Sequence, residues 1–295
     1  MHCHTATVLG TRRLSPHLAS VTLGVAEGYV GTGVPDEYVR VLIPPAGAEL
    51  VLPEIDESNL AWSYPEGAVE PAPRVYTVSD HRIVDGLVQI DVDIALHDVG
   101  IGSDWVRRVE VGDRVGVTDP RGLYAAEPDV AWQLLVADIT GVPAIARILR
   151  GLAPQQRVEV VVVLTDAADQ VALPSVADVD VTWTVVADER EVADALTSAV
   201  LDRELPDDGY VWLAGEARAS RAVRKHLRRT LGWPQSRFYT CGYWQFDAET
   251  WNARYAEVAE QVQPATIAAY RESLETGDEG AYLDQLEDIY EKAGL

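Results

Sequence analysis

The pattern of apolar residues changes near residue 130, and this change constrains the fold more than any other feature. Before it, short strand-like runs are separated by Gly, Pro and Asp; after it, unbroken apolar runs alternate with helical patterns. The first pattern is typical of an antiparallel sandwich or barrel. The second indicates a parallel sheet covered by helices on both faces. We therefore predict a β + α/β chain, with an N-terminal antiparallel β-barrel followed by an open parallel α/β module and a helical C-terminal tail.

Three units are expected: a barrel domain over 1–127, an α/β domain over 128–245 and a helical tail over 246–295. The tail carries 12 acidic and 3 basic residues, and Trp251 and Tyr255 begin an apolar series at helical spacing. Two interpretations of the tail stay open. Its helices pack on the body of the protein, or they form an acidic arm for a partner.

The apolar runs also predict the individual elements. The barrel strands are expected at 5–9, 20–25, 38–43, 74–78, 87–96 and 114–118, with a Pro-rich, acidic excursion over 44–73. The strands of the α/β domain are expected at 133–137, 158–164, 179–186, 210–215 and 237–241, with helices near 143–152, 190–200 and 217–231.

Charge and cysteine content narrow the function classes. A net charge of −23 argues against nucleic acid and anionic membranes as partners. No apolar run approaches the roughly 20 residues that a transmembrane helix needs, and the N-terminus lacks a signal-peptide pattern. The only cysteines, Cys3 and Cys241, form no metal-binding or disulfide pattern. We expect a monomeric cytoplasmic protein without membrane insertion and without a protein-bound metal ion.

The turn after the first α/β strand is a candidate ligand site. Asp138 and Thr140 lie in this turn, and Pro143 stands where a helix begins. Ligands of open α/β sheets bind at this edge, against backbone N–H groups of a helix N-terminus. The GxGxxG dinucleotide fingerprint is absent. An ordinary strand–helix connection remains the alternative.

A second candidate is the strand Arg74-Val75-Tyr76-Thr77-Val78. Arg74, Tyr76 and Val78 share one face of it, whereas Thr77 lies on the other. An Arg offers a fork of donors to a pyrophosphate, and a neighbouring Tyr can flank a ring. A plain surface strand would explain the same four or five residues.

A third candidate follows the strand that contains Asp93. His97 comes at the strand end, and a small-residue turn with Gly102 and Ser103 leads into a helix expected to open at Trp105. Backbone N–H groups at such a helix start can bind an anion. His97 taken alone is equally consistent with a polar residue that closes a strand.

Taken together, these motifs resemble the siderophore-interacting protein family, the flavin-containing ferric-siderophore reductases related to ferredoxin–NADP reductases. The resemblance runs in order over about residues 5–245. It is carried by Leu14-Ser15-Pro16-His17-Leu18, Arg74-x-Tyr76-Thr77, Asp93-x-x-x-His97, the 100–105 turn, Gly112-Asp113, Asp119-Pro120-Arg121-Gly122, Asp138-x-Thr140-x-x-Pro143-Ala144, Trp212-x-Ala214-Gly215-Glu216 and Gly242-Tyr243-Trp244.

The resemblance implies an FAD-binding barrel and an NADPH- or NADH-binding α/β module. The residues it assigns to FAD are Arg74, Tyr76, Thr77, Val78, Asp93, His97, Gly102, Ser103 and Trp105. Those it assigns to the nicotinamide cofactor are Asp138, Thr140, Ala214, Gly215 and Glu216, while Tyr243 and Trp244 return toward the isoalloxazine. Arg40 stands where relatives carry a Lys or Arg, so it is the candidate siderophore-binding residue; a solvated strand charge is the alternative.

The chain departs from the family pattern at several places. Ser79 stands where the family has a second Arg, and Arg82 is a candidate replacement for it. The other departures are Asp119 in place of Gly, Gly141 in place of Ala, and Gln245-Phe246 in place of Arg and Gly.

The implied reaction passes electrons from NADPH, NADH or a ferredoxin through FAD to siderophore-bound Fe(III), which releases Fe(II) for iron assimilation. The flavin links a two-electron donor to a one-electron acceptor, so no catalytic acid or base is required. An acidic body favours a neutral or weakly charged chelate, such as a hydroxamate, as the substrate. Two alternatives remain: a flavin reductase that serves a protein partner, and a non-catalytic siderophore- or flavin-binding protein.

One helix is strongly basic and has several interpretations. Its cations recur at spacings of three and four residues over 217–231, and they include Arg218, Arg221 and Arg224. A solvated face or pairing with the acidic tail is one explanation. Recognition of a cofactor 2′-phosphate and docking of an acidic ferredoxin are the others.

Overall fold

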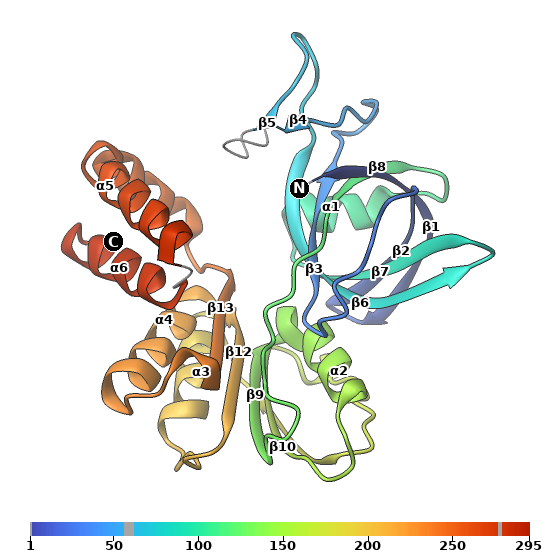
Figure 1. Ribbon diagram of the computed structural model, residues 1–295. Coiled ribbons are helices and arrows are strands. Elements are labelled where there is room, and N and C mark those ends of the chain that lie inside the picture. Colours follow the sequence, from blue (N-terminus) through green and yellow to red (C-terminus); the bar gives the residue numbers. More distant parts are fainter. Residues whose placement is uncertain (1, 56–61, 277–278) are drawn as a thin grey trace.

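A β-barrel lies against a parallel α/β sheet, and two C-terminal helices flank the last strand of that sheet (Figure 1). This computed structural model describes residues 2–55, 62–276 and 279–295. The predicted fold class is confirmed. No helix within those ranges is both long enough and apolar enough to cross a bilayer.

The barrel closes with six antiparallel strands in the order β1-β2-β7-β6-β3-β8. Inward-facing residues along them, such as Val8, Val21 and Val92, are fully buried and form one core with Trp105 of the short helix α1. The strands are β1 Cys3–Ser15, β2 Leu18–Val25, β3 Tyr38–Ile43, β6 Ala72–Val84, β7 Leu87–Ala95 and β8 Arg114–Thr118, and α1 covers Ile101–Arg108. The excursion between β3 and β6 carries the strand pair β4 Glu54–Ile55 and β5 Trp62–Ser63.

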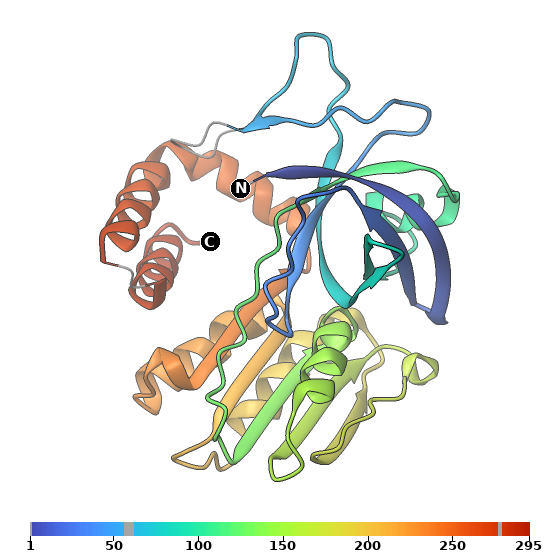
Figure 2. The same cartoon turned by 45° about the vertical axis from the view of Figure 1, so that its right-hand side comes forward.

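The second domain is a five-stranded parallel sheet in the order β11-β10-β9-β12-β13. Helix α2 packs on one face, and α3 and α4 pack on the other (Figure 2). The elements are β9 Trp132–Asp138, α2 Val142–Gly151, β10 Arg157–Leu164, β11 Asp178–Val185, α3 Val192–Leu201, β12 Tyr210–Glu216, α4 Ala217–Lys225 and β13 Phe238–Trp244. The strand order reverses between β9 and β12, where open α/β sheets bind ligands.

Two local expectations are corrected. The helix expected to open at Trp105 begins four residues earlier, at Ile101, because Gly100 turns the chain with a φ of 128°. The basic helix expected over 217–231 is α-helical to Lys225 and continues as one π-helical turn, His226–Thr230.

The two domains are joined through buried polar contacts. Asp36, from the loop before β3, accepts hydrogen bonds from the backbone N–H groups of Leu123 (2.7 Å) and Tyr124 (2.8 Å) and from Trp212 Nε1 (3.2 Å). Trp212 belongs to the inner strand β12, so this carboxyl ties the barrel and the interdomain connection to the sheet. Burial raises the pKa of the Asp36 carboxyl.

The tail folds into an antiparallel helical pair, α5 Ala248–Thr276 and α6 Glu279–Lys292. Ring contacts join Trp251 to Tyr290 near one end of the pair and Tyr270 to Tyr282 near the other. Helix α6 lies on the basic helix, with ion pairs Arg224–Asp284, Arg228–Asp284, Arg229–Asp288 and Lys225–Glu291. Of the two interpretations of the tail, packing on the body is the one that the structure supports.

Candidate functional site

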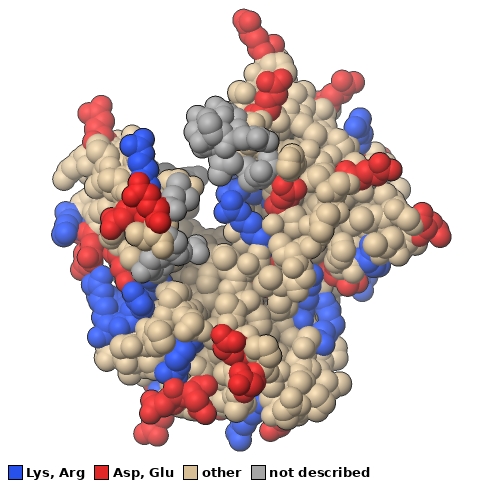
Figure 3. Space-filling model, in the orientation of Figure 1, with Lys and Arg blue, Asp and Glu red and all other residues tan. Residues whose placement is uncertain are grey.

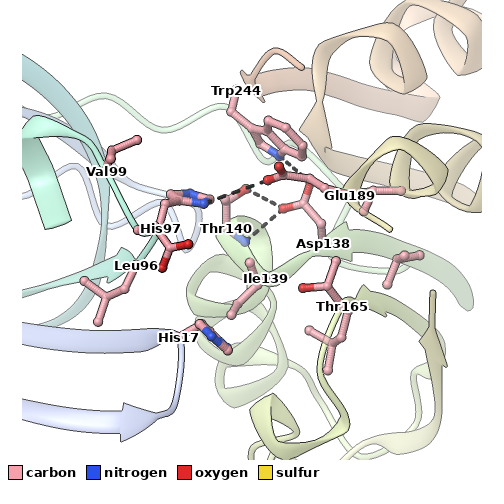
Figure 4. Close-up of a pocket in the computed structure, with 14 residues that line it drawn as sticks. His17, Leu96, His97, Val99, Asp138, Ile139, Thr140, Thr165, Glu189 and Trp244 are labelled. Atoms are coloured by element: carbon pink, nitrogen blue, oxygen red, sulfur yellow. Dashed lines mark hydrogen bonds and ion pairs between the residues drawn. The ribbon is translucent and has the colours of Figure 1, made fainter. Parts of the chain in front are cut away.

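A pocket of about 420 Å³ lies where the barrel meets the C-terminal edge of the parallel sheet (Figure 4). The loops of the barrel form one wall and the ends of the sheet strands form the other. The lining residues are His17, Leu96, His97, Asp98 and Val99 from the barrel, and Asp138, Ile139, Thr140, Val163, Leu164, Thr165, Glu189, Val192 and Trp244 from the α/β domain. Of the predicted residues, His97, Asp138, Thr140 and Trp244 therefore meet in one place.

Asp138 organises the sheet side of this pocket. Its Oδ1 accepts hydrogen bonds from the Thr140 N–H (2.9 Å) and the Thr140 hydroxyl (2.6 Å), and its Oδ2 accepts one from Trp244 Nε1 (2.7 Å). Burial raises the pKa of the Asp138 carboxyl. Asp138 thus fixes the turn at the start of α2 and the indole of Trp244 together.

Gly215 allows β12 to pass directly behind Asp138. Its φ is 159°, and a Cβ at this position would lie 2.4 Å from Asp138 Oδ2. Its neighbour Glu216 is buried and caps α4, because its Oε2 accepts from the N–H groups of Arg218 and Ala219. Ala214, also predicted for the nicotinamide cofactor, is fully buried in β12.

The predicted flavin-binding residues gather at the junction of β6 with α1. A Cβ on Gly102 would lie 2.0 Å from the Tyr76 hydroxyl, so this face of β6 touches the first turn of α1. Helix α1 begins without a side-chain cap, and the exposed Arg74 shares the Tyr76 face of β6. An aromatic ring next to a guanidinium and open N–H groups suits the ring and phosphates of FAD, so the residues present fit this cofactor.

Other predicted flavin residues stabilise the helix and strands that meet at this junction. Ser103 accepts a hydrogen bond from the His97 N–H (2.9 Å), and Trp105 is buried in the barrel core. Asp93 accepts one from the hydroxyl of Ser79 (2.8 Å), and burial raises its pKa. Ser79 therefore meets Asp93 at the place where the family has an Arg.

Thr77 and Val78 point to opposite sides of β6: Thr77 lies near Tyr243 of the α/β domain, whereas the Val78 side chain packs in the barrel core. Both side chains are buried, and the backbone carbonyl of Val78 is the group that meets α2. Burial raises the pKa of Tyr243 well above its usual value. Tyr243 thus lies next to β6. The next residue, Trp244, lines the 420 Å³ pocket between the barrel and the sheet, which we call the seam pocket.

Arg82, the candidate replacement for the missing Arg at position 79, pairs with carboxylates of the barrel. Arg82 donates to both oxygens of Asp91 (2.9 and 3.0 Å) and to Asp80 (3.3 Å). The guanidinium groups that approach β6 at this level come from α2: Arg147 donates to the Val78 carbonyl (2.7 Å) and Arg150 donates to the Ser79 carbonyl.

Arg40 lies away from the seam pocket, on the barrel strand β3. Its backbone N–H donates to the Thr118 hydroxyl (3.0 Å), and the charges of Arg40 and Arg121 both act on Tyr38. Burial raises the pKa of Tyr38. Figure 3 shows a hollow between the tail and the barrel with basic side chains on the barrel side.

A second pocket of about 330 Å³ adjoins the first, because Glu189 lines both. It lies between the starts of α3 and α4 and contains three guanidinium groups, those of Arg190, Arg218 and Arg221. The sequence analysis singled out the helix that bears two of them but missed Arg190. It also missed Thr165, although this residue directly follows an unbroken apolar strand, which is the signal that places it at the ligand-binding edge.

Two family profiles match this chain. The siderophore-interacting FAD-binding domain matches residues 7–124, and the siderophore-interacting protein profile matches residues 130–247. The chain belongs to the siderophore-interacting protein family. In this chain the match to the FAD-binding domain precedes the second match, in the order that the sequence predicted.

Named relatives and a solved structure agree with this assignment. The NADPH-dependent ferric-chelate reductase of Escherichia coli is 29% identical over 81% of this chain and 91% of that protein. The ferric vibriobactin reductase of Vibrio cholerae is 26% identical over 79% of this chain and 85% of that protein. A siderophore utilization protein from T. fusca is 27% identical, with a TM-score of 0.71 over 83% of this chain and 94% of that one.

The contact between Gly102 and Tyr76 gives a first testable prediction. Gly102→Ala pushes the Tyr76 ring away from α1, and we expect FAD affinity to fall about tenfold, since overpacking costs about 1–3 kcal/mol. The measurement is a fluorescence titration of the FAD-free protein with FAD. Gly10→Ala is the matched control, because no atom lies within 4 Å of a Cβ at Gly10. Equal FAD affinity in the two variants would contradict the prediction.

Proposed function

We propose that this protein is a cytoplasmic FAD-dependent ferric-siderophore reductase with NADPH as its electron donor. The observation that carries the proposal is the seam pocket, in which the Asp138–Thr140 turn and Trp244 face the end of the FAD-binding barrel. The ferric-chelate and vibriobactin reductases to which the chain is similar support the substrate class.

The bound flavin would supply the redox chemistry, since it accepts two electrons as a hydride and delivers them singly. One NADPH is then oxidised to NADP⁺ with release of one proton, and two Fe(III) complexes are reduced to Fe(II). The protein's own part is binding and orientation. Arg74 and the start of α1 hold the phosphates of FAD, Tyr76 flanks its ring, and Asp138 holds Trp244 at the pocket wall.

NADPH is proposed over NADH because of the second pocket. Its three guanidinium groups suit a 2′-phosphate, which NADH lacks. The nearest acidic partners of two of them, Asp188 for Arg190 and Asp194 for Arg218, are exposed ion pairs at 3.7 and 3.0 Å, which an incoming phosphate can replace.

The pocket predicts a selective loss of NADPH binding. The double variant R218Q/R221Q is expected to raise the KM for NADPH about tenfold or more and to leave the KM for NADH nearly unchanged, because charge-assisted hydrogen bonds to the phosphate are lost. Steady-state kinetics with each donor measures both values. Arg229→Gln serves as the control, since Arg229 pairs with Asp288 of the tail. Equal losses with NADPH and NADH would refute the assignment of this pocket.

The position of the tail decides whether the basic helix is available to a ferredoxin, the alternative electron donor. An acidic ferredoxin would dock on a basic surface, but α6 already covers Arg224, Arg228 and Arg229 with its own carboxylates. The part of the basic helix that carries Arg224, Arg228 and Arg229 is thus paired with the tail, which disfavours docking of a ferredoxin there.

For the ferric siderophore we propose the hollow between barrel and tail, whose barrel side carries basic side chains (Figure 3). Arg40 of β3 remains the residue proposed to bind it. The deciding experiment is anaerobic. NADPH should bleach the flavin absorbance of the FAD-loaded protein, and subsequent addition of a ferric hydroxamate siderophore should restore it while a ferrous trap develops colour. Bleaching without reduction of any ferric siderophore would rule out the proposed substrate. A flavin that neither NADPH nor NADH reduces would rule out the reductase.

A further inference from the structure

Helix α2 connects the two candidate cofactor sites. It begins directly after the Asp138–Thr140 turn, and its ten residues run toward β6, the strand that carries Tyr76 and Thr77. Arg147, one and a half turns into α2, donates from NH1 to the carbonyl of Val78 at 2.7 Å. Its side chain is only 16% exposed, so this hydrogen bond is shielded from water.

A buried carboxylate fixes the Arg147 guanidinium. Glu37 is fully buried, and its Oε1 lies 3.7 Å from Arg147 NH1. Its Oε2 accepts hydrogen bonds from the N–H and the hydroxyl of Thr32, and its backbone carbonyl accepts from the Val78 N–H at 2.8 Å. Val78 therefore bonds through its N–H to Glu37 and through its carbonyl to Arg147, while the Glu37 carboxylate lies beside the Arg147 guanidinium.

Two consecutive residues of β6 are held by α2 of the α/β domain in this way. The carbonyl of Val78 accepts a hydrogen bond from Arg147, and the carbonyl of Ser79 accepts one from Arg150. Of these two contacts, the one through Arg147 also has a buried carboxylate beside it, since Glu37 Oε1 lies 3.7 Å from Arg147 NH1. It connects the strand assigned to the flavin with the helix whose first turn is assigned to the nicotinamide cofactor.

We propose that Arg147 is a positioning residue for hydride transfer, which sets the distance between the nicotinamide on the α2 turn and the flavin on β6. The proposal rests on the proposed function. Arg147 itself touches neither reacting atom, so its effect is on the rate of the transfer and not on the affinity for either cofactor. Misplacement of the reacting atoms by about 1 Å is enough to slow such a step about 100-fold.

The test is the anaerobic rate of flavin reduction by NADPH in a stopped-flow instrument. Arg147→Gln is expected to slow this step about 10- to 100-fold, with FAD and NADPH dissociation constants within about threefold of the wild type. Arg147→Lys keeps the charge and should recover part of the rate. Arg203→Gln is the matched control, because Arg203 also donates to a backbone carbonyl and faces a Glu at 3.8 Å, but away from the domain boundary.

Arg147→Gln also leaves the Glu37 carboxylate buried without this cation, which can prevent folding. The double variant E37Q/R147Q removes both charges and is expected to fold while still reducing its flavin slowly. A wild-type rate in this folded double variant would overturn the proposal, and so would a rate loss explained entirely by weaker FAD or NADPH binding.

A readout without turnover separates this inference from the proposed function. Hydrogen exchange in a peptide covering 74–84 should be faster in E37Q/R147Q than in wild type, and unchanged in Arg203→Gln. If neither nicotinamide reduces the wild-type flavin, the proposed function fails whatever the exchange shows. If the wild-type flavin is reduced normally and hydrogen exchange in 74–84 is the same in all three proteins, only the positioning role of Arg147 is refuted.

Discussion

Replacing Asp36 with alanine is expected to lower the free energy of unfolding by about 3–4 kcal/mol, because three buried donors lose their common acceptor. These donors are the N–H groups of Leu123 and Tyr124 and Nε1 of the fully buried Trp212. Asp36 itself is 2% exposed, so water does not take its place without rearrangement. The loss should be accompanied by looser docking of the barrel on the sheet.

Denaturant titration of the variant and the wild type measures this loss. Asp166→Ala is the matched control, since Asp166 caps one backbone N–H in an exposed 3₁₀ turn and its removal should cost about 1 kcal/mol. If the two variants differ by less than about 1 kcal/mol, the Asp36 carboxyl is not the tie between the domains that its contacts indicate.

The pH dependence of this loss follows from the raised pKa of Asp36. Because the folded state binds this proton more tightly than the unfolded chain, the neutral side chain stabilises the fold below the unfolded-state pKa of about 4. That contribution disappears as the pH rises through the folded-state pKa. The difference between wild type and Asp36→Ala should therefore be larger at low pH than at neutral pH.

The order of elements could be predicted from the sequence because hydrophobic periodicity is local. Strands 38–43 and 114–118 were predicted to the residue, since turn residues bound them on both sides. The strand predicted over 74–78 instead extends over Ala72–Val84. Its second half lacks a buried apolar pattern, since 79–82 are polar and Ile83 and Val84 are exposed. It is held in a hairpin by the turn at Asp85 and Gly86, both at positive φ.

Part of the candidate site could be predicted, because the carboxyl ends of parallel strands meet at one edge of the sheet. This rule and the family resemblance brought Asp138, Thr140 and Trp244 to one pocket. The partners that fix them could not be predicted, because they are remote along the chain: Asp36 and Trp212 are 176 residues apart, and Val78 and Arg147 are 69 apart. Pairings over such distances depend on the docking of two domains, which no local pattern encodes.

Replacing Asp284 with alanine is expected to release the tail from α4, with a loss of about 2–3 kcal/mol from the docked state. Asp284 Oδ1 accepts from Arg224 at 2.9 Å, and Oδ2 accepts from Arg228 at 3.1 Å. The Arg224 side chain is 6% exposed, so the loss of this carboxylate penalises a guanidinium that has little access to water. Asp284 thus contributes more than the exposed ion pairs around it.

Limited proteolysis and hydrogen exchange of α5 and α6 measure the release. In Asp284→Ala both helices should become accessible to protease and to exchange, while the barrel and sheet stay protected. High salt should shift the wild type in the same direction, because it screens the ion pairs between α6 and the basic helix. Glu291→Gln is the matched control, because the Lys225–Glu291 pair is exposed at 3.6 Å and contributes at most about 0.5 kcal/mol. If α6 stays protected in Asp284→Ala, then apolar packing rather than charge holds the tail, and the basic helix would not be freed for a partner by salt.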